Sequence, residues 1–315
     1  MKSKASAPGK IILFGEHFVV YGVKAILCAI DKRVTVTAEK TSKNQISIKS
    51  SVGELVTSPK KPIGEIESQL RPFYFLADMI IQQNDGNSGI EISIDSEIPL
   101  GVGLGSSSAC CVAGAAAISG VFAKKSREEI LQMAIEAEKT IFPNTSGADC
   151  TVCTYGGLMQ YDKQNGHSRI NLEPNFQLVI ANSKMEHSTK EVVSRVHQFK
   201  EKNEGEFSSI CMEETDLVED VLINLKNNDL AGIGKKMRKN QEYLETIGVS
   251  NERLRDMIGI ANKSSFGAKV TGAGGGGCIF ALTDETRKEK TTRQLKEKGY
   301  DCFSAKIDFA GLDNL

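Results

Sequence analysis

The segment that most constrains the fold runs from Ile98 to Ala117 and reads IPLGVGLGSSSACCVAGAAA. The preceding stretch, GIEISIDSEI, ends at Ile98, and its apolar residues alternate as they do in a strand with one buried face. Three glycines then lead into serines and small apolar residues, which predict a tightly packed helix from about Ser106. A helix N-terminus behind a glycine turn is suited to bind an anion, because its free N–H groups and its dipole favour negative charge.

The glycine turn alone leaves its ligand open. Gly101, Gly103 and Gly105 are each two residues apart, so the turn matches neither a Walker A loop nor a GxGxxG fingerprint. A nucleotide-phosphate site and a plain turn into a packed helix are both consistent with it. A second glycine run, from Gly272 to Gly277, does match GxGxxG, but it lacks the βαβ unit and the acidic residue of a dinucleotide site. We interpret it as a loop whose backbone approaches a ligand closely, with a flexible loop as the alternative.

Length, charge and hydropathy exclude several classes of protein. The 315 residues suffice for about two domains, and a net charge of -1 gives no support for binding nucleic acid or an acidic membrane surface. The N-terminal MKSKASAPGK is too polar for a signal peptide. The longest nearly apolar run, 109–123, is shorter than the ~20 residues of a transmembrane helix. We therefore expect a cytoplasmic protein.

Eight cysteines raise the question of a metal or disulfide site. Cys150 and Cys153 form a CxxC pair, but no second pair and no pair of histidines stands at the spacing of a zinc finger. Cys110 and Cys111 lie in an apolar stretch, where a free cysteine packs like a small hydrophobic residue. We expect reduced, buried thiols.

Hydrophobic periodicity predicts strands and helices along the whole chain. Strands are expected at 11–14, 18–21, 32–40, 46–50, 89–98 and 176–183, and on both sides of the second glycine run. Helices are expected at 73–83, from about Ser106, and within 208–263. Ser126 with Glu129, and Ser188 with Glu191, form capping boxes that start two more helices. The polar stretch 162–175 indicates a junction, so we divide the chain into domains at 1–165 and 166–315.

Several charged and hydroxyl residues together favour phosphoryl transfer, which needs a cation at the phosphates, a Mg²⁺ ligand and a carboxylate near the attacking hydroxyl. The candidates are Lys10, Glu16, Ser106, Ser107, Glu138 and Asp149. Each has an ordinary structural alternative. Asp149 could be a turn residue, Glu138 a solvated helix position, and the neighbouring His17 a buried core histidine. The combination, rather than any single residue, points to a kinase.

Three blocks of the sequence resemble the GHMP kinase superfamily, which includes galactokinase, homoserine kinase, mevalonate kinase and phosphomevalonate kinase. The blocks are APGKIILFGEHFVVYG (Ala7–Gly22), PLGVGLGSSSA (Pro99–Ala109) and KVTGAGGGGC (Lys269–Cys278). The first block is most similar to that of mevalonate kinases, because galactokinases tend to carry GEHTDY there and phosphomevalonate kinases GEY. The resemblance implies an α+β fold of two domains with the active site in the cleft between them. The N-terminal domain would resemble ribosomal protein S5 domain 2, and the C-terminal domain would be ferredoxin-like.

The resemblance also implies an activity, the ATP- and Mg²⁺-dependent transfer of a γ-phosphoryl group to the C5 hydroxyl of (R)-mevalonate in isoprenoid biosynthesis. Another kinase of the superfamily, acting on phosphomevalonate, a sugar or homoserine, is the nearest alternative. A non-catalytic sensor with this fold, or a nicotinamide-dependent oxidoreductase built on the second glycine run, is more distant. We expect a small-molecule substrate, no nucleic acid or membrane partner, and a homodimer as a candidate assembly.

The residue roles of the superfamily carry over onto matching positions. Asp149 would be the catalytic base, with Lys10 between it and the substrate hydroxyl. Ser107 and Glu138 would bind Mg²⁺, and Glu16, His17 and Thr189 would line the substrate end together with Lys10 and Asp149. The ATP phosphates would be wrapped by Pro99, Leu100, Gly101, Val102, Gly103, Leu104, Gly105, Ser106, Ser107, Ser108 and Ala109. The second glycine loop would comprise Gly272, Ala273, Gly274 and Gly275.

Two places depart from the mevalonate kinase pattern. Many of these enzymes read HGxPSGxD where this chain reads FPNTSGAD, from Phe142 to Asp149. The third serine of the glycine turn, Ser108, stands where alanine is commoner. Because the Ser-Gly-x-Asp core is retained, we expect the base to be kept and the altered turn to affect local geometry and substrate specificity.

Overall fold

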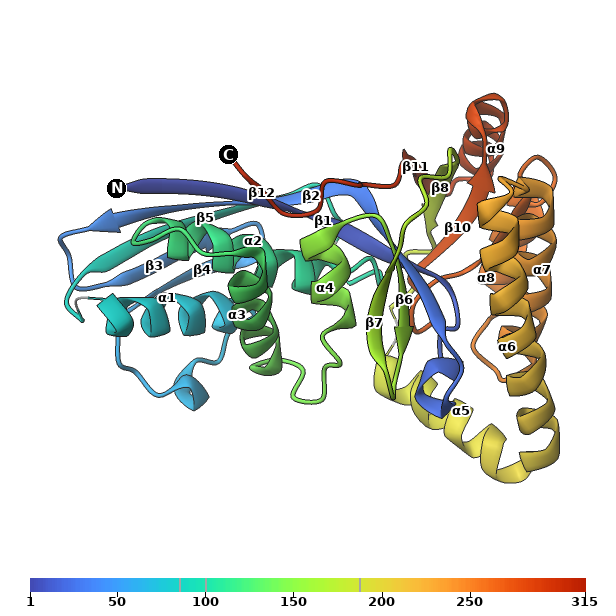
Figure 1. The fold of residues 1–315 in the computed structure, drawn as a ribbon, viewed down its shortest axis with the longest axis horizontal. Coiled ribbons are helices and arrows are strands. Elements are labelled where there is room, and N and C mark those ends of the chain that lie inside the picture. The colour runs from blue at the N-terminus through green and yellow to red at the C-terminus, as the bar shows by residue number, and fades with distance from the viewer. Residues whose placement is uncertain (85, 100, 187) are drawn as a thin grey trace.

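The computed structural model describes residues 1–84, 86–99, 101–186 and 188–315, and within them the chain forms two β-sheets with helices packed on them (Figure 1). The strands of the larger sheet are β1 (Lys2–Phe14), β2 (Ala25–Thr41), β3 (Ile46–Ser50), β4 (Gly53–Thr57), β5 (Gly89–Ser96), β6 (Leu158–Asp162), β7 (Gly166–Ile170) and β12 (Asp313–Asn314). Their order is β12-β1-β2-β5-β3-β4, and the β6–β7 hairpin is joined to β2. The strands of the smaller sheet are β8 (Gln177–Asn182), β9 (Gly267–Val270), β10 (Cys278–Thr283) and β11 (Asp301–Ala305). They are antiparallel in the order β11-β8-β10-β9.

The helices divide between the two sheets. Those packed under the larger sheet in Figure 1 are α1 (Arg71–Asn84), α2 (Ser106–Gly120), α3 (Arg127–Lys139) and α4 (Ala148–Tyr155). Those of the other half are α5 (Thr189–Lys202), α6 (Glu204–Lys226), α7 (Leu230–Thr246), α8 (Glu252–Ala261) and α9 (Glu285–Glu297). Helices α7, α8 and α9 contact the smaller sheet, whereas α6 packs on α7 and α5 packs on α6. The molecule is therefore α+β in two halves.

Helix α2 forms the centre of the larger half. It contacts β1, β2, α1, α3 and α4, and most of its side chains are buried. A Cβ atom at Gly114 would lie 2.8 Å from a ring carbon of Phe73, so a small residue is required where α1 crosses. The predicted tightly packed helix from Ser106 is confirmed. Contacts with five other elements therefore fix the position of this helix.

Most predicted elements are confirmed, and one is wrong. Ser126 caps α3 in a complete capping box with Glu129. The predicted strand at 18–21 is instead a 3-10 helix, Phe18–Tyr21. Gly15 (φ 88°) and His17 (φ 64°) adopt left-handed backbone conformations, which turn the chain out of the direction of β1. Of the apolar residues that suggested a strand, Phe18 is buried in the core, whereas Val20 is exposed.

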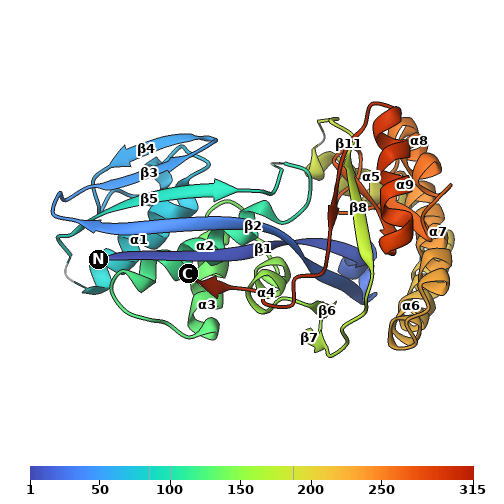
Figure 2. The same cartoon turned by 90° about the horizontal axis from the view of Figure 1, so that it is seen from above.

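The C-terminal segment 306–315, called the strap here, returns from the smaller sheet to the larger one. Ile307 bridges to Ile30, and β12 pairs with β1, so both chain termini lie on the larger sheet (Figure 2). The predicted domain boundary at 165/166 falls inside the β6–β7 hairpin, and the strap lies with the N-terminal half. The division into domains at that residue remains a prediction.

Arg33 fastens the strap to β1, and its removal is expected to destabilise the protein. The guanidinium forms an ion pair with Asp308 and donates to the backbone oxygens of Ser6 at 3.0 Å and Gly311 at 2.7 Å. Arg33→Met should lower the free energy of unfolding by about 3 kcal/mol, because the Asp308 carboxylate stays buried without its partner. Denaturant unfolding measures this change.

The matched control for this prediction is an exposed ion pair on the same sheet. Lys49→Met removes the pair between Lys49 and Glu54, whose side chains are 75% and 61% exposed. The control should change the free energy of unfolding by less than about 0.5 kcal/mol. Equal losses for the two variants would show that the strap contact is not a stabilising feature.

The expectation of buried thiols holds for five of the eight cysteines, because Cys110, Cys211 and Cys302 are half-buried. All eight cysteines are free thiols, and Cys28, Cys111, Cys150, Cys153 and Cys278 are buried. Burial raises the pKa of the Cys278 thiol to about 12, so this thiol is protonated at neutral pH. In the described part of the chain, no helix is both long and apolar enough to cross a membrane.

Candidate active site

The structure brings Lys10 and Asp149 together. Lys10 lies on β1 with only 5% of its side chain exposed, and its Nζ is 2.9 Å from Oδ2 of Asp149, whose side chain is 36% exposed. Asp149 stands in the first turn of α4, which begins after Gly147 (φ 74°). This positive φ favours glycine, and a Cβ atom there would lie 2.7 Å from Cδ1 of Ile135. A shielded ammonium therefore lies beside a carboxylate that solvent and substrate can reach.

The glycine turn before α2 packs directly on Lys10. A Cβ atom at Gly105 would lie 2.6 Å from Cγ of Lys10, and the Lys10 N–H donates to the Leu104 carbonyl at 2.9 Å. Val102 and Leu104 are buried, whereas Gly103 is exposed. The turn is thus anchored by its apolar side chains and presents backbone outward, as an anion site requires.

The second glycine run meets the first one. A Cβ atom at Gly272 would lie 3.6 Å from both the Cα and the carbonyl oxygen of Gly103, so the two backbones are separated by no side chain. The Thr271 hydroxyl donates to the carbonyl of Ile12 at 3.1 Å and accepts from its N–H at the same distance. Segments from the two halves of the chain therefore share one site.

His17 and Glu16 connect the loop after β1 to that second run. The His17 Nε2–H donates to the Ala273 carbonyl at 2.8 Å, and burial lowers the pKa of His17. The imidazole is consequently neutral at neutral pH and acts as a hydrogen-bond donor. Glu16 forms an ion pair with Lys269 of β9. Both residues therefore fix the loop that follows β1.

A buried ionic cluster, composed of Glu16, Glu214, Asn240 and Lys269, lies behind this loop. Glu214 on α6 accepts hydrogen bonds from the side-chain amide of Asn240 at 2.6 Å and from the Gly15 N–H at 3.2 Å. Glu16 is 2% exposed and the other three members are fully buried. The cluster joins β9, α6 and α7 to the segment that carries His17 and Glu16.

The ionic cluster holds two carboxylates beside one ammonium. Burial raises the pKa of Glu214 to about 8, and the neighbouring Glu16 carboxylate adds to that effect. A proton on Glu214 at neutral pH leaves one neutral ion pair, between Glu16 and Lys269. Sequence reasoning missed Glu214. Its position among the buried apolar residues of α6, on the face formed by Phe207, Ile210, Leu217, Val218 and Val221, is the signal that could have revealed it.

Glu138, one of the predicted Mg²⁺ ligands, is buried on α3 with 3% exposure. Its Oε1 accepts a hydrogen bond from the Ser108 hydroxyl, and its Oε2 accepts one from the Thr145 hydroxyl at 2.6 Å. The serine of the glycine turn that contacts Glu138 is therefore Ser108, whereas Ser107 is half-buried in the same first turn of α2. The sequence places Ser108 among the residues predicted to wrap the ATP phosphates, and it predicts no role for Thr145.

This arrangement fits a magnesium ion that is bound together with nucleotide. No group of three or more His, Cys, Asp or Glu side chains that could hold a metal occurs among the described residues. Mg²⁺ in ATP-using enzymes commonly takes one or two protein carboxylates and completes its shell with phosphate oxygens and water. Glu138 keeps unused lone pairs on both oxygens and lies beside the serines of α2. Ser107 and Glu138 as metal ligands remain a prediction.

The other predicted residues occupy several environments. Pro99, Ser106 and Gly275 are half-buried, and Ala109 is fully buried. Leu100 lies outside the described residues. Thr189 is the first residue of α5 and is exposed, and its place at the substrate end remains a prediction.

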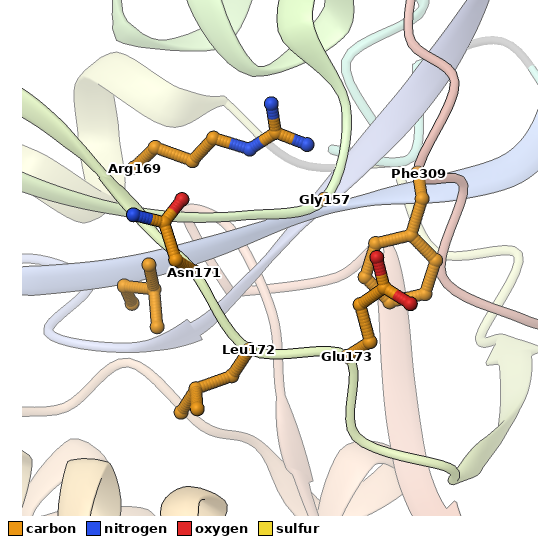
Figure 3. A pocket seen from close by; sticks show the side chains of 7 residues that line it. Gly157, Arg169, Asn171, Leu172, Glu173 and Phe309 are labelled. Atoms are coloured by element: carbon orange, nitrogen blue, oxygen red, sulfur yellow. The ribbon is translucent and has the colours of Figure 1, made fainter.

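A pocket of about 270 Å³ is lined by none of the predicted site residues (Figure 3). Figure 3 shows Arg169, Asn171 and Glu173 extending from β7 and the segment that follows it, with Phe309 of the strap beside them. The candidate active site is therefore the junction of the two glycine turns rather than this pocket.

Both halves of the chain match family models. Residues 73–157 match the N-terminal domain of the GHMP kinases, and residues 221–301 match their C-terminal domain. The class that the fold and the site define is therefore the GHMP kinases, and the predicted two-domain α+β fold is confirmed.

Similar proteins specify the family further. A mevalonate kinase from Thermococcus onnurineus is 35% identical over 310 residues, which cover 93% of this chain and 92% of that protein. The crystal structure of Methanococcus jannaschii mevalonate kinase is 28% identical with a TM-score of 0.87, and the match covers 97% of this chain and 98% of that one. The structure of L. major mevalonate kinase in complex with R-mevalonate is 25% identical with a TM-score of 0.82, covering 98% and 97%. This chain belongs to the mevalonate kinase family.

Proposed function

We propose that this chain transfers the γ-phosphoryl group of ATP to the C5 hydroxyl of (R)-mevalonate, which yields 5-phosphomevalonate and ADP. The observation that carries the proposal is the Lys10–Asp149 ion pair of 2.9 Å against the glycine turn. Similarity to mevalonate kinases over nearly the whole chain, one of them crystallised with R-mevalonate, supports the choice of substrate.

Asp149 accepts the proton of the attacking hydroxyl in this proposal. A primary alcohol is too weak an acid to be deprotonated in the ground state, and a loose transition state allows the proton to leave late. Lys10 holds its ammonium beside the carboxylate and stabilises negative charge that develops on the hydroxyl oxygen. The partial exposure of Asp149 leaves room for the substrate hydroxyl.

The glycine turn and the N-terminus of α2 receive the phosphates. Their outward backbone N–H groups and the helix dipole favour anionic oxygens. Mg²⁺, when bound with ATP, neutralises phosphate charge, and Glu138 and Ser107 are the residues that would hold it. The second run, Gly272–Gly275, closes the same site from the other half, and His17 keeps that run in place through Ala273.

The proposal also covers the cellular location of the protein, its partners and its assembly. We place it in the cytoplasm, as an enzyme that acts on a small molecule without a nucleic acid or membrane partner. Its net charge of -1 supports this setting, since it provides no overall attraction to phosphate-rich surfaces. A homodimer remains the candidate assembly.

A substrate panel tests the proposed function. Purified protein with ATP and Mg²⁺ is offered mevalonate, phosphomevalonate, galactose and homoserine in turn, and ADP release is followed by a coupled assay. We expect kcat/KM to be highest for mevalonate, by at least about 100-fold, because phosphomevalonate has no free C5 hydroxyl, and galactose and homoserine differ from mevalonate in shape and charge. A preference for another acceptor would refute the substrate assignment, and ligand binding without any turnover would identify a sensor.

A further inference from the structure

Ser108 and Thr145 contact the two oxygens of the same buried carboxylate. The Ser108 hydroxyl donates to Oε1 of Glu138 and the Thr145 hydroxyl donates to Oε2 at 2.6 Å. The three residues come from three segments, the first turn of α2, the end of α3 and the loop before α4. Both hydroxyls stand where the sequence departs from the common mevalonate kinase pattern, at positions commonly occupied by alanine and proline, which have no hydroxyl.

Glu138 is buried, so these two hydrogen bonds replace the water that would otherwise solvate its carboxylate. The carboxylate is 3% exposed, and Ser108 is 1% exposed, so water contributes little to their solvation. The nearby thiols of Cys111 and Cys150 are buried, and burial raises the pKa of each. The negative charge of Glu138 raises the pKa of both thiols further. A buried carboxylate needs strong donors, and hydrogen bonds to an ionised group are about twice as strong as neutral ones.

The geometry of the pair fixes the carboxylate group. A single donor would leave it free to rotate about its last bond, whereas one donor on each oxygen defines the plane of the group. Each carboxylate oxygen has two lone pairs, so each keeps one for a further ligand. The group is thus held at the first turn of α2 with coordinating capacity still available.

We propose that Ser108 and Thr145 are positioning residues that hold the Glu138 carboxylate ready for a divalent cation bound with nucleotide at the α2 N-terminus. This inference rests on the proposed function, in which Glu138 binds Mg²⁺. In this proposal the two hydroxyls serve as donors to Glu138 and not as ligands of the cation. They act through the carboxylate, whose orientation in the metal-free protein they set in advance.

Metal binding to the protein provides the test. The free Mn²⁺ signal is followed by electron paramagnetic resonance while Mn²⁺ is titrated into full-length protein with saturating ADP. Ser108→Ala and Thr145→Val are each expected to weaken Mn²⁺ binding by about 10-fold or more, as is typical when a partner of a metal ligand is lost. Ser108→Thr and Thr145→Ser keep a hydroxyl and should restore most of the affinity.

Matched controls remove hydroxyls that serve only their own helix. The Ser119 hydroxyl of α2 bonds the Ala115 carbonyl at 2.6 Å, and the Thr140 hydroxyl bonds the Ala137 carbonyl at 2.6 Å. Ser119→Ala and Thr140→Val should leave Mn²⁺ affinity unchanged. A purely structural role of Ser108 and Thr145 would lower the melting temperature of their variants without weakening Mn²⁺ binding.

The outcomes separate this inference from the proposed function. Wild-type Mn²⁺ affinity in Ser108→Ala and Thr145→Val would overturn the positioning role, even in an active mevalonate kinase. If Ser108→Ala does not fold, Thr145→Val decides alone, because Thr145 is half-exposed in a loop. Failure of the wild-type protein to phosphorylate mevalonate would refute the proposed function, whereas the Mn²⁺ titration would still report on the carboxylate.

Discussion

Asp149→Asn is expected to lower kcat for mevalonate phosphorylation by about 100- to 10,000-fold, the range that a positioned general base contributes. Asparagine keeps the size and shape of the side chain but cannot accept the proton of the hydroxyl. It also leaves the ammonium of Lys10, 2.9 Å away, without its anionic partner. The glycine turn does not depend on this carboxylate, so the affinity for ATP should stay within about threefold of the wild type.

The measurement combines steady-state kinetics with nucleotide binding followed by calorimetry. Asp301→Asn is the matched control, because it changes another Lys–Asp pair in the same way. Lys184 and Asp301 are 2.6 Å apart but 62% and 70% exposed. The control should retain wild-type turnover. If Asp149→Asn keeps turnover within about tenfold of the wild type, Asp149 is not the base.

Glu214→Gln is expected to stabilise the protein at alkaline pH. The folded state raises the pKa of Glu214 from 4.5 to about 8, so the folded protein binds this proton more tightly than the unfolded chain does. Stability is therefore lost as pH rises from near 4.5 to near 8 and stays level above that range. Glutamine imitates the protonated group and does not titrate. The advantage of the variant should grow over this interval and reach on the order of 4 kcal/mol.

Denaturant unfolding at pH 5, 7 and 9 measures this difference. The groups that face Glu214 are Glu16 and Lys269 of the ionic cluster, the Asn240 amide and the Gly15 N–H, and all of them are unchanged in the variant. Glu219→Gln is the matched control, five residues later on α6 and exposed, and it should show the pH profile of the wild type. If the free energy of unfolding changes with pH in the same way for the wild type and Glu214→Gln, Glu214 is ionised in the folded protein from pH 5 to 9.

Local features of this fold could be predicted because neighbouring residues determine them. The alternation in β5, the glycine turn and the small residues of α2 define their own conformations. The cap of α3 likewise needs only Ser126 and Glu129. Where a distant constraint dominates, the prediction fails. Phe18–Tyr21 has strand-forming residues, but the turns at Gly15 and His17 and the packing of Phe18 make it a 3-10 helix.

Only the site residues that lie in recognisable sequence motifs could be predicted. Lys10 and Asp149 were assigned together through the family resemblance, and the structure places them in contact. The partners of Glu16 and Glu138 depend on which segments the tertiary fold brings together. Lys269 belongs to a recognised block, yet nothing in that block indicates that its side chain is buried against Glu16. Buried polar pairing is a property of the assembled structure rather than of any local pattern.

The most direct test of the central claim is the identity of the product. Purified protein is incubated with ATP, Mg²⁺ and (R)-mevalonate, and the product is analysed by phosphorus–proton correlation NMR. We expect one new phosphomonoester whose phosphorus couples to the C5 methylene protons, formed in equal amount with ADP. ADP without a phosphorylated product, or phosphorus on the C3 oxygen or the carboxylate, would contradict it.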